Sequence, residues 1–276
     1  MKQLQRERPG HTYFAGAPLL IAHRGGAKLA PENTMEAFQA AVQTWGADIL
    51  ETDARLTQDG RVVLIHDAAI DRTCDRSGQI NQMKWAEVRN LDAGYHFSDL
   101  NNQNSFRGRG VRIPLMEEVL ETFPNVRINV EAKCPEVAKP LVEIIRRQNA
   151  ETRVLLAAKI ESDRKKISSY SGPRGASRRD IAHFWSARHL RLLPYFRPTF
   201  DALQVPEVWN GIRVVTPGFV KEAHLLNIPV HVWVVDREED IRRLLSWGVD
   251  GIQADRLDIL SRVLKAVVKK GSSHAT

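Results

Sequence analysis

Two histidines stand at the ends of short apolar runs in this sequence. His23 follows Leu-Leu-Ile-Ala, and His66 ends the run that begins at Val62. An imidazole titrates near neutral pH, so it can accept or donate a proton during catalysis. A lone histidine in such a place is more often structural, but two of them in equivalent places favour an acid–base pair.

Three carboxylates belong to two further apolar runs. Alternation along a strand places Glu51 and Asp53 on one face of residues 48–53, and Glu131 and Lys133 on one face of residues 127–133. Clustered carboxylates repel one another unless a cation neutralises them, and all-oxygen ligands favour Mg²⁺ or Ca²⁺. The sequence leaves one alternative equally open, in which each carboxylate pairs with a neighbouring basic residue: Arg55, Arg127 or Lys133.

Two cations next to these groups suit an anionic substrate. Arg24 follows His23 and offers a planar donor fork that matches phosphate oxygens, while Lys133 offers a point charge. Gly25 and Gly26 allow a sharp backbone turn, which alone is weak evidence. A divalent cation, two histidines and two phosphate-facing cations together predict cleavage of a phosphodiester.

Short apolar runs alternate with amphipathic stretches from Pro18 onward, which is typical of parallel strands joined by crossover helices. The predicted strands are Leu19–Ala22, Asp48–Asp53, Val62–His66, Arg127–Lys133, Val154–Ala158, Ala202–Val205, Val230–Val235 and Gly251–Ala254. Helical spacing marks residues 33–45, where Asn33 and Glu36 resemble a capping box, and residues 237–247. Length and strand count favour an α/β fold of the (β/α)₈ TIM-barrel type. Polar strand faces, including that of His231 and Trp233, would then line the barrel mouth.

Two regions interrupt the alternation. Residues 68–113 are rich in Ser, Asn, Gly and Asp and predict a small subdomain inserted after an early strand. Residues 168–201 are basic, carry several aromatic residues and are expected to be mostly helical. We therefore expect a basic N-terminal arm (1–17), a barrel (18–265) and a basic C-terminal tail (266–276).

Composition narrows the class of protein further. The net charge of +7 could attract phosphorylated substrates, nucleic acid or an anionic membrane, although a solvated basic surface is the commoner meaning. Two cysteines, Cys74 and Cys134, do not make a disulfide framework. Residues 1–17 lack the pattern of a secretory signal, and the apolar runs are too short to span a bilayer. These features predict a cytoplasmic location.

The motifs, taken in order, resemble those of the glycerophosphodiester phosphodiesterase family. They are His23-Arg24-Gly25, Pro31-Glu32-Asn33-Thr34, Ala37-Phe38, Gly46-Ala47-Asp48, Glu51-Thr52-Asp53, Thr57, Asp59-Gly60, His66-Asp67, Asp71-Arg72-Thr73, Glu131-Ala132-Lys133, Val232-Trp233, Gly248-Val249-Asp250-Gly251-Ile252 and Asp255-Arg256. The resemblance spans residues 19–260, and its N-terminal block is the most specific part.

The resemblance implies a metal and a catalytic pair. Glu51, Asp53 and Glu131 would hold Mg²⁺ or Ca²⁺, and His23 and His66 would act as acid and base. The implied reaction converts a glycerophosphodiester and water to glycerol 3-phosphate and an alcohol. Whether water or a substrate hydroxyl attacks first, and which histidine is the base, stay open.

The resemblance also implies a substrate site. Arg24 and Lys133 would bind the phosphate, Glu32 would support the site and Trp233 would line it. Trp233 could equally well pack in the core beneath the barrel mouth. Glu32 could simply stabilise the N-terminus of its helix through the helix dipole. The insertion at 68–113 would form a capping subdomain at the glycerol end.

Other functions remain compatible with the residues. One is a lysophospholipase D-like phosphodiesterase that acts on lysophospholipids, and another is a non-catalytic barrel that binds phosphate or a membrane. The retention of both histidines and all three carboxylates argues against the second. We expect a small-molecule substrate, weak association with anionic membranes at most, and no nucleic-acid partner. The oligomeric state, the head group and the choice of metal are not predicted.

Overall fold

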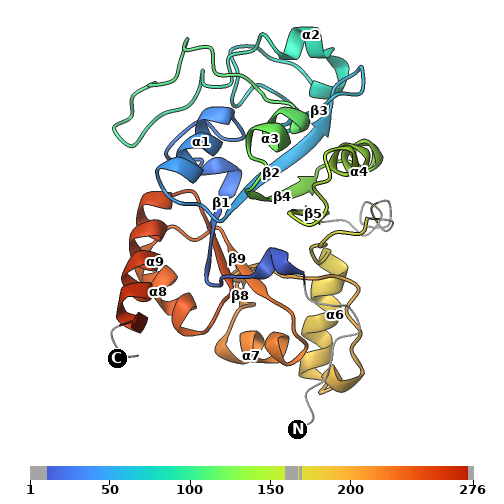
Figure 1. The fold of residues 1–276 in the computed structure, drawn as a ribbon, viewed down its shortest axis with the longest axis vertical. Helices are drawn as coiled ribbons and strands as arrows, with labels where there is room; N and C mark the ends of the chain where they lie inside the picture. The colour runs from blue at the N-terminus through green and yellow to red at the C-terminus, as the bar shows by residue number, and fades with distance from the viewer. Residues whose placement is uncertain (1–10, 159–166, 168–169, 273–276) are drawn as a thin grey trace.

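The computed structural model describes residues 11–158, 167 and 170–272 (Figure 1). Residues 1–10 of the expected N-terminal arm, residues 273–276 of the tail and the basic residues 164–166 lie outside the described part. Helices surround a central sheet, with α8 and α9 on one side and α4 and α6 on the other. In the described part, no helix combines the length and the apolar character needed to cross a bilayer.

Seven parallel strands form the barrel wall. In the order in which they pair they are β5 (Val154–Ala157), β4 (Arg127–Ala132), β2 (Ile49–Leu56), β1 (Leu19–Ala22), β10 (Gly251–Ala254), β9 (Val230–Trp233) and β6 (Leu203–Pro206). Parallel bridges from Leu156 to Arg174 and from Gly175 to Ala202 place a short segment between β5 and β6. This segment fills the eighth position, so the predicted (β/α)₈ barrel is confirmed.

The third predicted strand does not belong to the barrel wall. The run expected to be a strand over Val62–His66 is shorter, as β3 (Val62–Leu64), and pairs antiparallel with β2. Five residues, 57–61, separate β2 from β3, and a parallel crossover needs a dozen or more. Gly60, at φ +78°, completes the tight turn that makes the two strands a hairpin.

Helices pack on the outer face of the strands and bury the largest apolar cluster of the molecule. Their bounds are α1 (Met35–Gln43), α3 (Met116–Thr122), α4 (Ala138–Arg147), α6 (Arg178–His189), α7 (Pro217–Leu225), α8 (Glu238–Ser246) and α9 (Leu257–Ser272), while the short helix α2 (Trp85–Val88) packs in the insertion. Within the described residues 170–201 the regular helix is α6, followed by the 3₁₀ turn Leu193–Tyr195, so the expectation that this region is mostly helical was wrong.

The start of α1 differs from the expected capping box. Thr34 is the N-cap, and its hydroxyl accepts a hydrogen bond from the amide of Ala37. Asn33 is buried at φ +56° and turns its amide toward Asp53 instead. The capping-box prediction was therefore wrong, because Asn33 supports the site rather than the helix.

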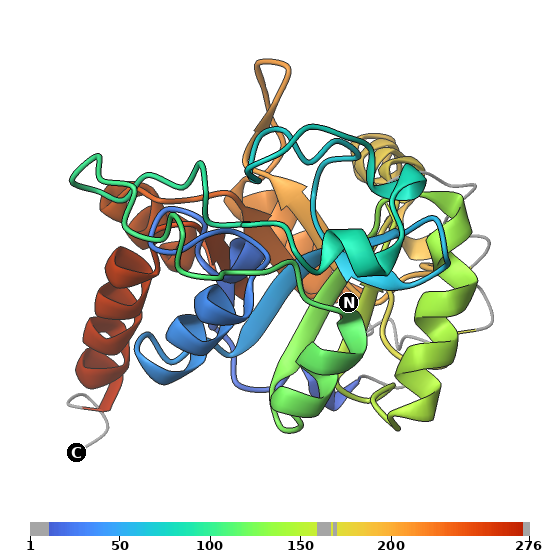
Figure 2. The ribbon, with the colours of Figure 1, turned by 90° about the horizontal axis from the view of Figure 1, so that it is seen from above.

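The insertion has a small apolar core of its own. It lies beyond β3, where loops and the short helix α2 extend from the barrel (Figure 2). Its buried residues include Ile70, Cys74, Ile80 and Val88. Because this cluster is separate from the main core, the insertion can present side chains to the barrel mouth without reshaping the barrel.

The N-terminal end of the barrel is closed by the 3₁₀ turn Thr12–Phe14. Tyr13 is buried against Leu19, Ile21 and Ile49. Arg127 holds this turn by donating to the carbonyl oxygens of Tyr13 and Ala15, at 3.0 and 2.7 Å.

His231 also lies in this end of the barrel. It is 1% exposed, and its ring centroid is 5.8 Å from that of Phe14. The expectation that His231 lines the mouth with Trp233 was wrong, since His231 faces inward one layer deeper in the barrel.

Candidate active site

A strained turn after β1 forms one edge of the site. Residues His23–Gly25 make a 3₁₀ turn in which Arg24 has a left-handed backbone, with φ +50°. Gly25 follows at φ +84°, and a Cβ there would lie 2.7 Å from the Cβ of Ala37. The turn directs the amide of Arg24 to Glu51 Oε2 at 2.9 Å. The close approach to α1 therefore requires glycine, and it fixes His23 next to the carboxylates.

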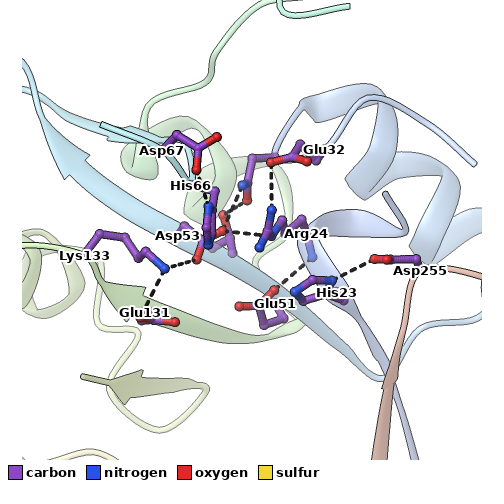
Figure 3. Close-up of polar contacts among 12 residues, drawn as sticks. His23, Arg24, Glu32, Glu51, Asp53, His66, Asp67, Glu131, Lys133 and Asp255 are labelled. Carbon is purple, nitrogen blue, oxygen red and sulfur yellow. Dashed lines mark hydrogen bonds and ion pairs between the residues drawn. The ribbon is translucent and has the colours of Figure 1, made fainter. Parts of the chain in front are cut away.

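Both candidate catalytic histidines are oriented by a carboxylate (Figure 3). His23 Nδ1 lies 2.7 Å from Asp255 Oδ1, and His66 Nδ1 lies 2.7 Å from Asp67 Oδ1. Arg55 donates to the carbonyl oxygen of His66 at 2.9 Å and anchors that loop. With Nδ1 engaged, each ring keeps Nε2 for proton transfer.

The two histidines have different pKa values for physical reasons. Burial alone would lower the pKa of His23, but the hydrogen bond to Asp255 and the charge of Glu51 outweigh it and raise that pKa. Burial lowers the pKa of His66 despite the opposing charge of Asp53. His23 is thus better suited to donate a proton, and His66 to accept one.

The three candidate metal ligands share one wall of the barrel. In the pairing of β2 with β4, Asp53 lies opposite Glu131 and Glu51 lies opposite Asn129. Burial, reinforced by the charge of Asp53, raises the pKa of Glu51 to about 7. The amide of Arg24 and the charges of His23 and Arg24 offset only part of this rise.

Lys133 partly neutralises the same wall. Its Nζ lies 3.4 Å from Asp53 and 3.2 Å from Glu131. Burial would raise the pKa of Asp53, but the charges of Lys133 and Arg24 outweigh it and lower that pKa. Of the three basic residues expected as possible partners, Arg127 donates to the N-terminal turn and Arg55 donates to the carbonyl oxygen of His66. Lys133 is the one that pairs with these carboxylates.

The wall fits a hard divalent cation in the kind of its donors. Glu51, Asp53 and Glu131 offer oxygen ligands, and the raised pKa of Glu51 marks a carboxyl group whose charged form a cation would stabilise further. Among the described residues, no three His, Cys, Asp or Glu side chains are already arranged as an ion site. Binding would therefore require these side chains to turn toward the ion.

Arg24 belongs to a network that reaches into the insertion. Its Nη1 donates to Glu32 at 3.0 Å, and its Nε lies 3.4 Å from Asp53. Arg72 donates to both oxygens of Glu32 at 2.7 Å and to Asp67 at 2.6 Å. Glu32 thus positions Arg24, and Arg72 connects it to the partner of His66.

A cavity of about 630 Å³ opens over these groups. Its charged end is lined by His23, Arg24, Glu51, Asp53, His66 and Glu131. Its opposite wall is mainly apolar and comes from α6, β6, β9 and the segment that follows β6, with Ile181, Trp185, Pro206, Trp209, Ile212, Val214, Trp233 and Val234. Trp233 therefore lines the cavity, whereas Glu32 and Lys133 reach it through their ion pairs.

Sequence reasoning did not assign a role to several residues that organise the site. Asp255 directly follows β10, and Asp67 directly follows His66, so both stand where a side chain could reach the barrel mouth. Asn33 donates to Asp53 at 3.1 Å, and its left-handed backbone has no clear sequence signal. Arg72 lies in the insertion, so its contact depends on the tertiary structure alone.

Comparisons with known proteins show the family of the chain. The model of the glycerophosphoryl diester phosphodiesterase family matches residues 23–259. A Mycobacterium tuberculosis protein named probable glycerophosphodiester phosphodiesterase 2 is 32% identical, covering 91% of this chain and 92% of the relative. The human protein named Lysophospholipase D GDPD1 is 28% identical, covering 85% of this chain and 82% of the relative.

Solved structures share the fold. An Oleispira antarctica phosphodiesterase in complex with the product sn-glycerol-3-phosphate superposes with a TM-score of 0.75 at 22% identity, covering 92% of this chain and 99% of that one. The family match extends from the first candidate histidine to α9, and so includes every residue of the charged cavity end. The chain belongs to the glycerophosphoryl diester phosphodiesterase family.

Proposed function

We propose that the protein hydrolyses glycerophosphodiesters to glycerol 3-phosphate and an alcohol with a divalent cation and histidine acid–base catalysis. The observation that carries the proposal is the charged end of the cavity, where two carboxylate-oriented histidines line the same space as Glu51, Asp53 and Glu131. The name of the M. tuberculosis relative and the product bound to the O. antarctica enzyme support this choice of substrate.

The side chains divide the work of phosphodiester cleavage. Arg24, with Glu32 fixing its guanidinium, binds the non-bridging oxygens, and Lys133 adds a second positive charge. His66 takes the proton of the attacking oxygen, and His23 protonates the alcohol oxygen as the P–O bond breaks. The opposite pKa shifts of the two rings support these roles.

Glu51, Asp53 and Glu131 would hold Mg²⁺ or Ca²⁺. When bound, the cation supplies Lewis-acid polarisation of a phosphoryl oxygen and balances the carboxylate charge. Trp233 and the apolar wall enclose the part of the cavity that would receive the rest of the substrate.

A second candidate is hydrolysis of lysophospholipids. The apolar wall formed by α6 and the segment after β6 exceeds what glycerol and a small alcohol require, and it would suit an acyl chain. The name of the human relative supports this substrate class. The same assay separates the two, because lysophosphatidylcholine and glycerophosphocholine differ by that one chain.

The test begins with metal-stripped protein. Glycerophosphocholine, glycerophosphoethanolamine and lysophosphatidylcholine are supplied in turn, Mg²⁺ or Ca²⁺ is added back, and the phosphorus-containing products are followed by NMR. We expect glycerol 3-phosphate from the diesters with one of the cations and almost none without it. Absence of turnover with either cation on all three substrates would refute the proposal.

Metal binding is measured separately by calorimetry, so that it does not depend on activity. Glu51→Gln keeps the size of the side chain but removes a charged ligand, and we expect weaker cation binding by at least about tenfold. Glu143→Gln, on the exposed face of α4, is the matched control and should bind the cation as the wild type does. Equal affinity in the Glu51 variant would remove Glu51 from the ligand set.

A further inference from the structure

A two-stranded hairpin stands beside the cavity and projects from the barrel. It comprises β7 (Val208–Trp209) and β8 (Ile212–Arg213), joined at Asn210-Gly211 with φ values of +48° and +79°. These values match a tight two-residue turn. Figure 2 shows it as the narrow orange loop that extends beyond the rest of the rim. All six residues 208–213 are exposed.

The hairpin exposes apolar side chains on both of its faces, one of which also carries Arg213. Val208 pairs with Arg213, and Trp209 pairs with Ile212, so alternation puts Val208 on one face and the Trp209–Ile212 pair on the other. Val208 is 46% exposed, Trp209 47% and Ile212 55%. A flat protein partner would cover one face, whereas a lipid layer surrounds an inserted tip and covers both. The arrangement therefore favours a lipid surface over a protein surface.

Charge around the hairpin complements an anionic surface. Arg178, at the start of α6, lies 5.6 Å from the centre of the Trp209 ring, and the next residue, Arg179, is also exposed. Residues 208–213 include Arg213 and no acidic residue. Glu207, at the base of the hairpin, pairs with Arg213 and also with Arg243. A narrow hairpin whose strands expose apolar side chains, with basic residues near its base, is the pattern of a segment that inserts among anionic head groups.

The hairpin is continuous with the cavity wall. Trp209 and Ile212 both line the cavity, and so does Val234, which is 39% exposed at the end of β9. A surface that receives the hairpin tip consequently lies at the open side of the cavity. Substrate held in that surface could enter along the apolar wall without crossing water.

We propose that the β7–β8 hairpin docks the protein on anionic lipid surfaces and places the cavity mouth at the lipid–water boundary. This docking surface, defined as residues 208–213 with Arg178 and Arg179, acts independently of which diester is hydrolysed. The occupant is the lipid head-group layer, with Val208, Trp209 and Ile212 reaching into the acyl boundary.

The test measures co-sedimentation of the full chain with vesicles, so it does not depend on turnover. Vesicles of phosphatidylcholine alone are compared with an equimolar mixture of phosphatidylcholine and phosphatidylglycerol. We expect binding to the mixed vesicles that Val208→Asp weakens by at least about tenfold and Val208→Trp strengthens. Val267→Asp, on the far helix α9 where the valine is 38% exposed, is the matched control and should bind like the wild type.

Val208 does not line the cavity, so turnover of soluble glycerophosphocholine by Val208→Asp should equal that of the wild type and report correct folding. Failure of the wild type to bind mixed vesicles would overturn the proposal, as would equal binding by Val208→Asp. Concentration-dependent dimerisation that Val208→Asp abolishes, without vesicle binding, would reassign the hairpin to contact between two copies of the chain.

Discussion

His231 makes folding stability depend on pH in a way that can be calculated. The imidazole is fully enclosed in the barrel, beneath Gly251 and beside Phe14. Neither ring nitrogen has a hydrogen-bond partner among the described residues. Burial in these surroundings lowers the pKa of His231 from 6.5 to about 4, so the ring is neutral in the folded protein at pH 7.

The sign of the effect follows from proton linkage. Between pH 6.5 and about 4 the unfolded chain binds a proton at His231, whereas the folded protein does not. The free energy of unfolding therefore falls as the pH falls through this window. Below about pH 4, His231 makes no further contribution to the pH dependence. A difference of 2.5 pKa units at about 1.4 kcal/mol each gives a loss of about 3 kcal/mol.

Comparison with His231→Leu isolates this contribution from those of the carboxylates. Urea unfolding of both proteins at pH 7, 5.5 and 4 gives the free energy of unfolding at each pH. We expect the wild type to lose about 3 kcal/mol more than the variant between pH 7 and 4. Parallel pH profiles would refute the reasoning, because they would mean that the ring is hydrated or already protonated in the folded state.

Three further substitutions probe the turn, a histidine partner and the core. Gly25→Ala forces a left-handed alanine against Ala37, and we expect a loss of about 2–3 kcal/mol of unfolding free energy in urea titrations. Asp255→Asn weakens the bond that raises the pKa of His23, so an NMR titration should show that pKa falling while kcat/KM drops by at least about tenfold. Phe219→Ala empties a fully buried position packed on Phe184 and should cost about 3–5 kcal/mol by the same unfolding assay. Unchanged values in any of the three would contradict the contact concerned.

The barrel could be predicted because most of the wall strands contain a short apolar run or apolar residues in alternation. The same signal misled at Val62–His66, where the apolar run is real but the five-residue turn before it forces an antiparallel hairpin. It also failed at Arg174-Gly175, which closes the barrel with two bridges and carries no apolar run. The positions of most strands could thus be predicted from composition, whereas the pairing and direction of a strand depended on the length of the connection before it.

The site was predictable where a local pattern places the side chain. Period-2 alternation put Glu51 and Asp53 on one strand face and Glu131 on another, the barrel fold predicted that these faces meet, and the register of β2 with β4 agrees. The end of β10 could have marked Asp255 as a candidate site residue, but its pairing with His23 could not be predicted, because the two are 232 residues apart along the chain. Arg72 was missed for the same reason, since its contact with Glu32 requires the insertion to fold back on the loop after β1.

The central claim is that His23 and His66 transfer protons during diester hydrolysis, and single substitutions test it most directly. His23→Ala, His66→Ala and His224→Ala are compared by kcat/KM on glycerophosphocholine, with His224 as the control because it is exposed on α7 and paired with Asp250. We predict a loss of at least about a hundredfold for each of the first two and less than about twofold for the third. Retention of wild-type kcat/KM by either His23→Ala or His66→Ala would contradict the account.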